Sequence, residues 1–206
     1  MSDEQSALAA RAAAGSGLSA GLLGLLRRHP RDGWQRAAGL AGSGEVWLAN
    51  HRHFRDLTGR ISGGVAALRD GRSAPDHFDG LFRHDLGSLL AGLDGHHRIE
   101  DHHYFPIFRQ AVPTLAPGFE ILDADHTALH AAIHDLAFAG QGLLRALGAQ
   151  AQAGDDRLAD AAARAAEDAA AVLARFGLLL GRHLDDEEDL VIPLILERAR
   201  ADPDFG

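Results

Sequence analysis

The sequence of 206 residues contains no cysteine. This absence excludes disulfide bonds, thiolate nucleophiles, zinc sites with thiolate ligands and cysteine-ligated iron–sulfur clusters. Any metal ion that the chain binds must therefore use nitrogen and oxygen ligands, which histidine, aspartate and glutamate supply.

Basic residues are scarce relative to acidic ones. The chain has 20 Lys and Arg against 29 Asp and Glu, which gives a formal net charge of -9. Binding to nucleic acid phosphates requires clustered Lys and Arg. We therefore expect no nucleic acid partner.

Long apolar runs are also missing. The longest, residues 17–26, is too short and too interrupted by glycine to span a membrane, and the acidic start MSDEQ is unlike a secretory signal. We expect a cytoplasmic protein without membrane association. A hydrophobic content of 46% with 24% charged residues is typical of a folded globular domain.

The apolar residues recur with helical periodicity, and no segment alternates as a β-strand would. We expect four long helices, at about 45–70, 76–112, from Pro117 onward, and at about 156–199. The apolar side of the second helix should include Phe82, Leu86, Leu90, Leu93 and Ile107. Since short connections join long helices, the fold class is all-α, as an up-down-up-down antiparallel four-helix bundle over residues 45–200.

Residues 1–44 form a separate part of the predicted organisation. Residues 1–16 are rich in Ala, Gly and Ser, which indicates a mobile arm. The apolar spacing in residues 18–29 then predicts a short helix that ends before Pro30. We expect this N-terminal helical extension to cover the bundle.

Two fragments at the ends of the second and fourth helices repeat one pattern. HHRIEDHHYFPIF and HLDDEEDLVIPLI each contain a histidine, a glutamate four residues later and a proline ten residues later: His96, Glu100 and Pro106, then His183, Glu187 and Pro193. Composition alone gives any one histidine this pattern with odds of roughly one in 760. Residues four apart lie on one helix face, so each imidazole and carboxylate should point into the bundle together.

His97 is an alternative to His96, because His97 and Asp101 are also four residues apart. The register set by the proline favours His96. Asp101, Asp125 and Glu188 are predicted to accept hydrogen bonds from ligating imidazoles. The acidic run 185–189 is predicted to be partly a solvated face, with Glu187 as the exception. The remaining histidines are predicted to be solvated or outside the ligand set, and they are His29, His53, His77, His84, His102, His103 and His134.

A weaker repeat, ANHRHF and ADHTAL, places His51 and His126 on the apolar sides of the first and third helices. Folding the helices together would then bring four histidines and two glutamates into one interior. Buried carboxylates repel one another unless cations compensate them. Mixed nitrogen and oxygen ligands suit iron, although manganese, zinc or copper also accept them.

These fragments resemble the hemerythrin-like, or HHE cation-binding, domains over about residues 45–200. The resemblance implies a four-helix bundle around two iron ions, with Glu100 and Glu187 bridging them. It also implies His130 as a ligand, through HTALH. One iron would then have His126, His130 and His183, and the other His51 and His96, with an open position for a small ligand.

One departure from the family's oxygen carriers concerns the fourth helix, where they have an aspartate five residues after the histidine. Here Glu187 is four residues and Glu188 five residues after His183. This spacing favours the broader HHE branch over a transport protein.

Three functions follow as hypotheses. The first is a binding protein that holds or senses dioxygen or another small diatomic ligand. It is placed before an enzyme because no acid, base or nucleophile stands apart from the predicted ligands. The second is a di-iron enzyme of oxidative or nitrosative defence that handles peroxide or nitric oxide, and the third is a metal-binding bundle that acts as an interaction or regulatory module. The sequence does not indicate the oligomeric state.

Overall fold

The structure is a computed structural model that describes residues 17–19, 21–153 and 156–201. The predicted arm, residues 1–16, lies outside the described residues. The described part of the chain is helical and contains no strand, which confirms the all-α prediction. None of its helices is long and apolar enough to cross a membrane.

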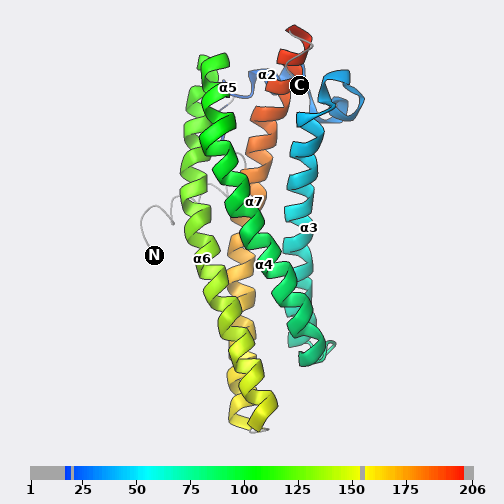
Figure 1. The fold of residues 1–206 in the computed structure, drawn as a ribbon, viewed down its shortest axis with the longest axis vertical. Coiled ribbons are helices and arrows are strands. Elements are labelled where there is room, and N and C mark those ends of the chain that lie inside the picture. Colours follow the sequence, from blue (N-terminus) through cyan, green and yellow to red (C-terminus); the bar gives the residue numbers. More distant parts are fainter. Residues whose placement is uncertain (1–16, 20, 154–155, 202–206) are drawn as a thin grey trace. The chain divides into compact units, whose positions relative to one another are not determined.

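Four long helices account for most of the chain (Figure 1). They are α3 (Ser43–Arg69), α4 (Pro75–Ile99), α6 (Ala116–Ala153) and α7 (Asp156–Ala201). Their ends lie within a few residues of the predicted ones, with one exception: the second predicted helix, at about 76–112, is divided into α4 and the shorter elements η3 (Glu100–Tyr104) and α5 (Phe105–Ala111). Gly71 has a φ of 68° just after α3, a left-handed conformation that glycine adopts without steric cost at the end of a helix.

Shorter elements precede and join these helices. The predicted helix at 18–29 is reduced to α2 (Gly24–Arg28), followed by the 3-10 helices η1 (Arg31–Arg36) and η2 (Ala38–Leu40). After α4 come a π-helical turn, η3 (Glu100–Tyr104), the helix α5 (Phe105–Ala111) and a 3-10 turn, η4 (Pro113–Leu115).

The π-helical turn changes which residues of the second predicted helix are buried. The N–H of Phe105 donates to the carbonyl of Glu100, five residues earlier, and Pro106 has no N–H to continue an α-helical pattern. The extra residue in this turn rotates the following side chains about the helix axis. As a result Ile107, predicted to be in the core, is 41% exposed, while Phe105 and Phe108 are buried.

The chain divides into two compact units. The first unit comprises Met1–His53, His97–Ala128 and Leu179–Gly206, and the second comprises Phe54–His96 and Leu129–Leu178. Each is described by itself. In the first unit, α2, α5, the start of α3, the start of α6 and the end of α7 surround one apolar core (Figure 1).

The core of the first unit includes residues from the N-terminal extension. Leu18, Trp34 and Leu40 are buried in one cluster with side chains of α3, α5, α6 and α7. In α6, a Cβ on Gly118 would lie 2.8 Å from a methyl carbon of Leu190, so the absence of a side chain there permits close helix packing. The extension is therefore an integral part of this unit.

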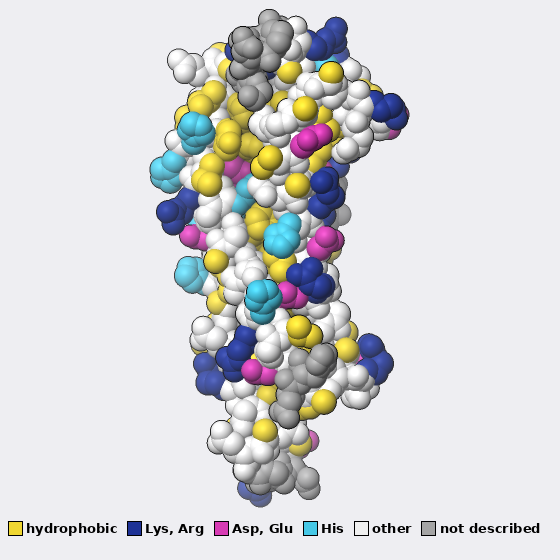
Figure 2. All heavy atoms as spheres, turned by 45° about the vertical axis from the view of Figure 1, so that its right-hand side comes forward, with side chains coloured by type: hydrophobic (Ala, Val, Ile, Leu, Met, Phe, Trp, Pro, Cys, Tyr) yellow, Lys and Arg dark blue, Asp and Glu magenta, His cyan; other side chains and the backbone are white. Residues whose placement is uncertain are grey.

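The second unit has a separate apolar core. Its buried side chains come from the second half of α3, most of α4, the later part of α6 and the first half of α7, and include Phe54, Leu57, Ile61, Phe78, Phe82, Leu89, Leu93, Leu129, Leu136, Leu143, Leu173 and Phe176. In Figure 2, which shows one face of the surface, arginine side chains are distributed among acidic, histidine and uncharged side chains.

Candidate metal centre

Three buried histidines of the first unit form the centre of the site. His97 comes from α4, His126 from α6 and His183 from α7, and their exposed fractions are 0%, 2% and 0%. Each offers a ring nitrogen, and these three atoms lie within 4.8 Å of one another. The rings of His97 and His126 are stacked with centroids 4.1 Å apart, and the ring of His183 meets that of His126 edge-on at 4.8 Å. This arrangement offers three imidazoles to one ion.

Two buried glutamates lie beside these histidines. Ligand atoms of Glu100, Glu187 and His51 also lie within 4.8 Å of one another. Glu187 Oε1 is 3.3 Å from His51 Nε2, and its Oε2 is 3.2 Å from His183 Nε2. Glu100 Oε2 is 3.6 Å from His126 Nε2. Glu187 therefore links the three-histidine group to the group around His51.

Helix geometry explains this convergence. His183 and Glu187 are four residues apart on α7, so their side chains share one face of the helix. Glu100 begins the π-helical turn and follows His97 by three residues, which also places the two side chains one turn apart.

Several buried side-chain nitrogen and oxygen atoms that could bind a metal ion have no hydrogen bond within the described part of the chain. They are Nε2 of His126, both ring nitrogens of His183 and Oε2 of Glu187. The 3.2 Å contact between His183 and Glu187 is not aligned as a hydrogen bond. Buried polar atoms without partners are costly, so the folded protein needs another group to satisfy them. A cation that accepts nitrogen and oxygen ligands fits this set of atoms.

The pKa values of Glu100 and Glu187 are shifted in opposite directions. Burial, reinforced by the charge of Glu187, raises the pKa of Glu100 well above its ordinary value. Burial also acts to raise the pKa of Glu187, but attraction to His51 and His183 outweighs it and holds that pKa well below its ordinary value. Without a cation, this site favours one ionised and one neutral carboxyl group.

The histidines respond to the same charges. Burial disfavours the charged form of His51, but Glu187 and Glu188 more than compensate and raise its pKa to about 9. The pKa of His183 is raised as well, because Asp125 and Glu187 together outweigh the effect of burial. Burial is the main cause that lowers the pKa of His126. The metal-free centre therefore holds protons that a cation would displace.

A carboxylate faces Nδ1 of three of these histidines. Asp101 Oδ1 lies 2.7 Å from Nδ1 of His126, Glu188 Oε1 lies 3.1 Å from Nδ1 of His51, and Asp125 Oδ2 lies 3.8 Å from Nδ1 of His183. The three acids are those predicted from the sequence as supports. Because each faces Nδ1, the Nε2 atoms are directed toward Glu100 and Glu187, as is common around bound metals.

Sequence reasoning missed several buried polar residues around the site. The acidic run 185–189 was predicted to be partly a solvated face apart from Glu187, but Asp186 is buried, as is Glu188, the predicted support. Asp186 is paired with the buried Arg182, which also pairs with Asp125. The spacing of four between Arg182 and Asp186 was the available signal.

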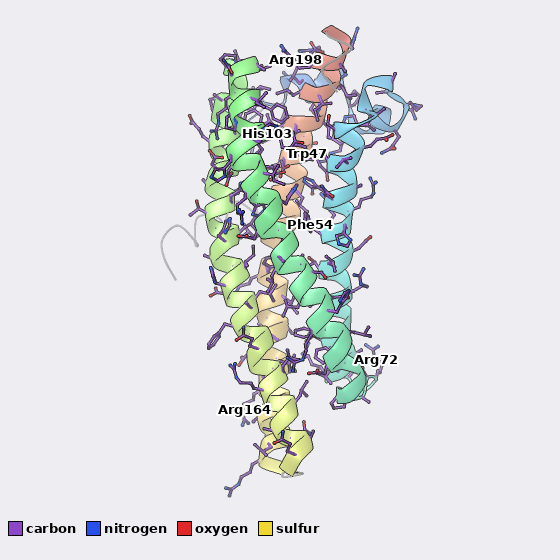
Figure 3. The ribbon with its side chains drawn as sticks, viewed as in Figure 1. Trp47, Phe54, Arg72, His103, Arg164 and Arg198 are labelled. Atoms are coloured by element: carbon purple, nitrogen blue, oxygen red, sulfur yellow. The ribbon has the colours of Figure 1, made fainter. Side chains whose placement is uncertain are left out.

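Trp47, a buried residue of α3, also contacts the site. Its Nε1–H donates to Glu187 Oε1 at 2.5 Å, from a position near the start of α3 (Figure 3). His29 was predicted to be solvated, but its ring is 2.7 Å from Glu197 and only 10% exposed.

The structure places the remaining predicted ligands in the second unit. His96 is the last residue that α4 contributes to that unit, where its half-buried ring packs against Phe54 with centroids 5.1 Å apart. His130 is partly exposed, with Nδ1 3.9 Å from Asp94. His97, the alternative to His96, is the neighbour that lies with His126 and His183.

Among the comparisons with known proteins, the one with protein-family models identifies a family. No curated protein and no solved structure matches the chain significantly. One family model, described as the hemerythrin HHE cation binding domain, matches residues 44–195. The match covers all the candidate ligands described above and begins at the end of the N-terminal extension. The chain therefore belongs to the hemerythrin HHE cation-binding domain family, and its function includes metal binding.

Proposed function

We propose that the protein is a non-haem di-iron protein that binds or senses dioxygen or another small diatomic ligand. The observation that supports this most directly is the position of Glu187, which has one oxygen beside His51 and the other beside His183. A carboxylate in this position is suited to bridge two cations. The two groups of potential ligands around it are both buried.

We assign His97, His126 and His183 to one ion, because their ring nitrogens converge within 4.8 Å. His51 then belongs to the other ion, with Glu100 and Glu187 shared between the two. We retain His96 as a further ligand of the His51 ion, since it precedes Glu100 by four residues in the helical chain. His130 stays a prediction from the family resemblance.

The proposed scaffold is the up-down-up-down four-helix bundle over residues 45–200, with residues 1–44 as an extension. Four long helices joined by short connections support it. The cytoplasmic location and the lack of a nucleic acid partner stay predictions from composition.

Iron held by imidazole and carboxylate ligands can change its oxidation state and bind small molecules at an open position. The chain's own residues would tune this chemistry. Trp47 orients Glu187 through its hydrogen bond, and Phe105 stacks on His126 with ring centroids 5.4 Å apart. Phe105 and Phe119 are fully buried nearby, so the walls of the site on that side are apolar and limit the entry of water.

The proposal is tested by metal analysis and visible absorption spectra. Protein from iron-replete cells should contain two irons per chain, and its spectrum, recorded after anaerobic reduction, should change on exposure to dioxygen and recover when dioxygen is removed. Zinc alone, or no metal, would contradict the di-iron proposal. Peroxide turnover well above that of free iron would favour the enzyme of oxidative defence, and two irons with no spectral response to dioxygen or nitric oxide would favour the regulatory module.

A further inference from the structure

The segment before α3 lies outside the family match but packs tightly against the end of α7. Trp34 and Leu40 are buried in the core of the first unit. A Cβ on Gly39 would lie 2.7 Å from the Cβ of Ala199, which leaves no room for a side chain at residue 39. The segment is thus held in a defined position next to the helix that carries His183 and Glu187.

Arg31 of this segment donates three hydrogen bonds to the acidic run of α7. Its Nε donates to Asp189 Oδ1 at 2.6 Å, its Nη1 to Glu188 Oε2 at 3.2 Å, and its Nη2 to the carbonyl of Asp185 at 2.8 Å. The guanidinium also lies 5.3 Å from the centre of the Trp34 ring. A planar guanidinium with several fixed bonds holds its partners in one orientation better than a single flexible charge would.

Glu188 connects Arg31 to the metal centre. One of its oxygens accepts from Arg31, and the other lies 3.1 Å from Nδ1 of His51. With Nδ1 of His51 engaged in this way, its Nε2 faces Glu187 at 3.3 Å. Glu188 is buried while Arg31 is partly exposed, so Arg31 is the outermost group of a chain of contacts that ends at the proposed ligands.

We propose that Arg31 is a positioning residue for the metal centre: by fixing Glu188, it fixes the ring orientation of His51. The proposal rests on the proposed metal centre. A carboxylate that accepts from the second nitrogen of a ligating imidazole sets the tautomer and orientation of that ligand. Arg31 extends this support by one more residue.

A second contact between the same segment and α7 also supports this role. The backbone N–H of Gly17 donates to Asp186 Oδ2 at 2.7 Å. Asp186 pairs with Arg182, which pairs with Asp125, the acid that faces His183. The segment thus contacts Glu188, which faces His51, and is connected through Asp186 and Arg182 to Asp125, which faces His183.

The chain offers a matched control for Arg31. Arg28 lies in the same segment and bonds Glu197 of the same helix, with Nη2 3.0 Å from Oε1. His29 shares Glu197 with Arg28, and none of the contacts described for Glu197 involves a ligand of the centre. The variants R31Q and R28Q therefore each remove one arginine–glutamate contact between the segment and α7, but only R31Q affects the path to His51.

The experiment measures the affinity for Co²⁺ by competition with a chelator, together with the visible spectrum of the bound Co²⁺, which reports ligand geometry. We expect R31Q to bind Co²⁺ about tenfold more weakly with an altered spectrum. R28Q should match the wild type in both, and R31K, which retains the charge but not the three contacts, should fall between. The proposal would be overturned if R31Q left the Co²⁺ affinity and spectrum unchanged, or if R28Q changed them as much as R31Q does. If R31Q fails to fold, a wild-type Co²⁺ affinity in R31K would overturn it.

A measurement on the metal-free protein tests the role of Arg31 independently of whether the protein binds metal. In NMR spectra of the metal-free protein, the Nδ1–H of His51 should exchange slowly with solvent in the wild type and in R28Q, and fast in R31Q. A wild type that binds no cation would refute the metal centre. The exchange of this proton would still decide whether Arg31 positions His51, and equal exchange in all three proteins would overturn the proposal.

Discussion

The indole N–H of Trp47 donates a 2.5 Å hydrogen bond to Oε1 of Glu187. The same oxygen lies 3.3 Å from Nε2 of His51, and the other oxygen of Glu187 lies near His183. Trp47 therefore fixes the plane of the carboxylate that joins the two groups of ligands.

Replacing Trp47 with phenylalanine tests this relationship, because the ring packing is largely retained and the donor is lost. We expect the metal affinity to fall about tenfold, as for other groups that orient ligands. Loss of a hydrogen bond to a charged acceptor should also lower the free energy of unfolding by about 1–3 kcal/mol. Chelator competition and urea unfolding measure the two effects, and an unchanged affinity would show that Trp47 acts only in packing.

The neighbouring residues Glu187 and Glu188 should differ in their effect on metal content. Glu187→Ala removes a proposed bridging ligand, so the purified variant should contain almost no metal. Glu188→Ala removes only the acid that faces Nδ1 of His51, so it should keep its metal with an affinity about 10- to 100-fold lower. Metal analysis after dialysis distinguishes them, and the reverse order would refute this assignment of ligands.

The roles of His96 and His97, which are adjacent in α4, can be distinguished by the same measurement of metal content. His97→Ala should lose the ion held with His126 and His183, and His96→Ala should lose the other. His102→Ala is a suitable control, because that side chain is exposed and its Nδ1 is 2.8 Å from the carbonyl of Arg98. The metal-to-protein ratio checks the prediction, and a full complement of metal in His97→Ala would contradict it.

The stability of the metal-free protein should depend on the ionisation of His51. Its pKa is about 9 in the folded protein against 6.5 in the unfolded chain. The folded state therefore binds this proton more tightly, so the stabilisation is fully present below about pH 6.5 and is lost as the pH rises through about 9. Urea unfolding of chelated protein from pH 6 to 9.5 should show this decrease, and His51→Gln should flatten it. A stability that rises over this range would contradict the assignment.

The sequence was sufficient to predict the helical class, the positions of three of the long helices, the start of the fourth (α4) and the family, all of which the structure or the family match confirms. Periodic apolar residues and the spacing of His183 and Glu187 carry that information locally. The π-helical turn at Glu100–Tyr104 could not be predicted, since the residues on both sides follow an α-helical pattern and Pro106 is its only sign. This turn also explains why Ile107 is exposed.

The buried charges were harder to predict for a different reason. The burial of Arg182 and Asp186 could not be recognised from the sequence, because the partner of Arg182 on another helix is Asp125, far away in the chain. The hydrogen-bonding partners of Arg31 are likewise far away in the chain, and its contacts with Glu188 and Asp189 arise only when the N-terminal segment packs on α7. Tertiary partners of this kind leave no periodic signal.

The central claim is that two ions lie on either side of Glu187. Anomalous diffraction at the iron absorption edge, from crystals of protein loaded anaerobically with Fe²⁺, tests it most directly. We predict two peaks, one among His97, His126 and His183 and one beside His51, with Glu187 between them. A single peak, or peaks remote from Glu187, would contradict the claim.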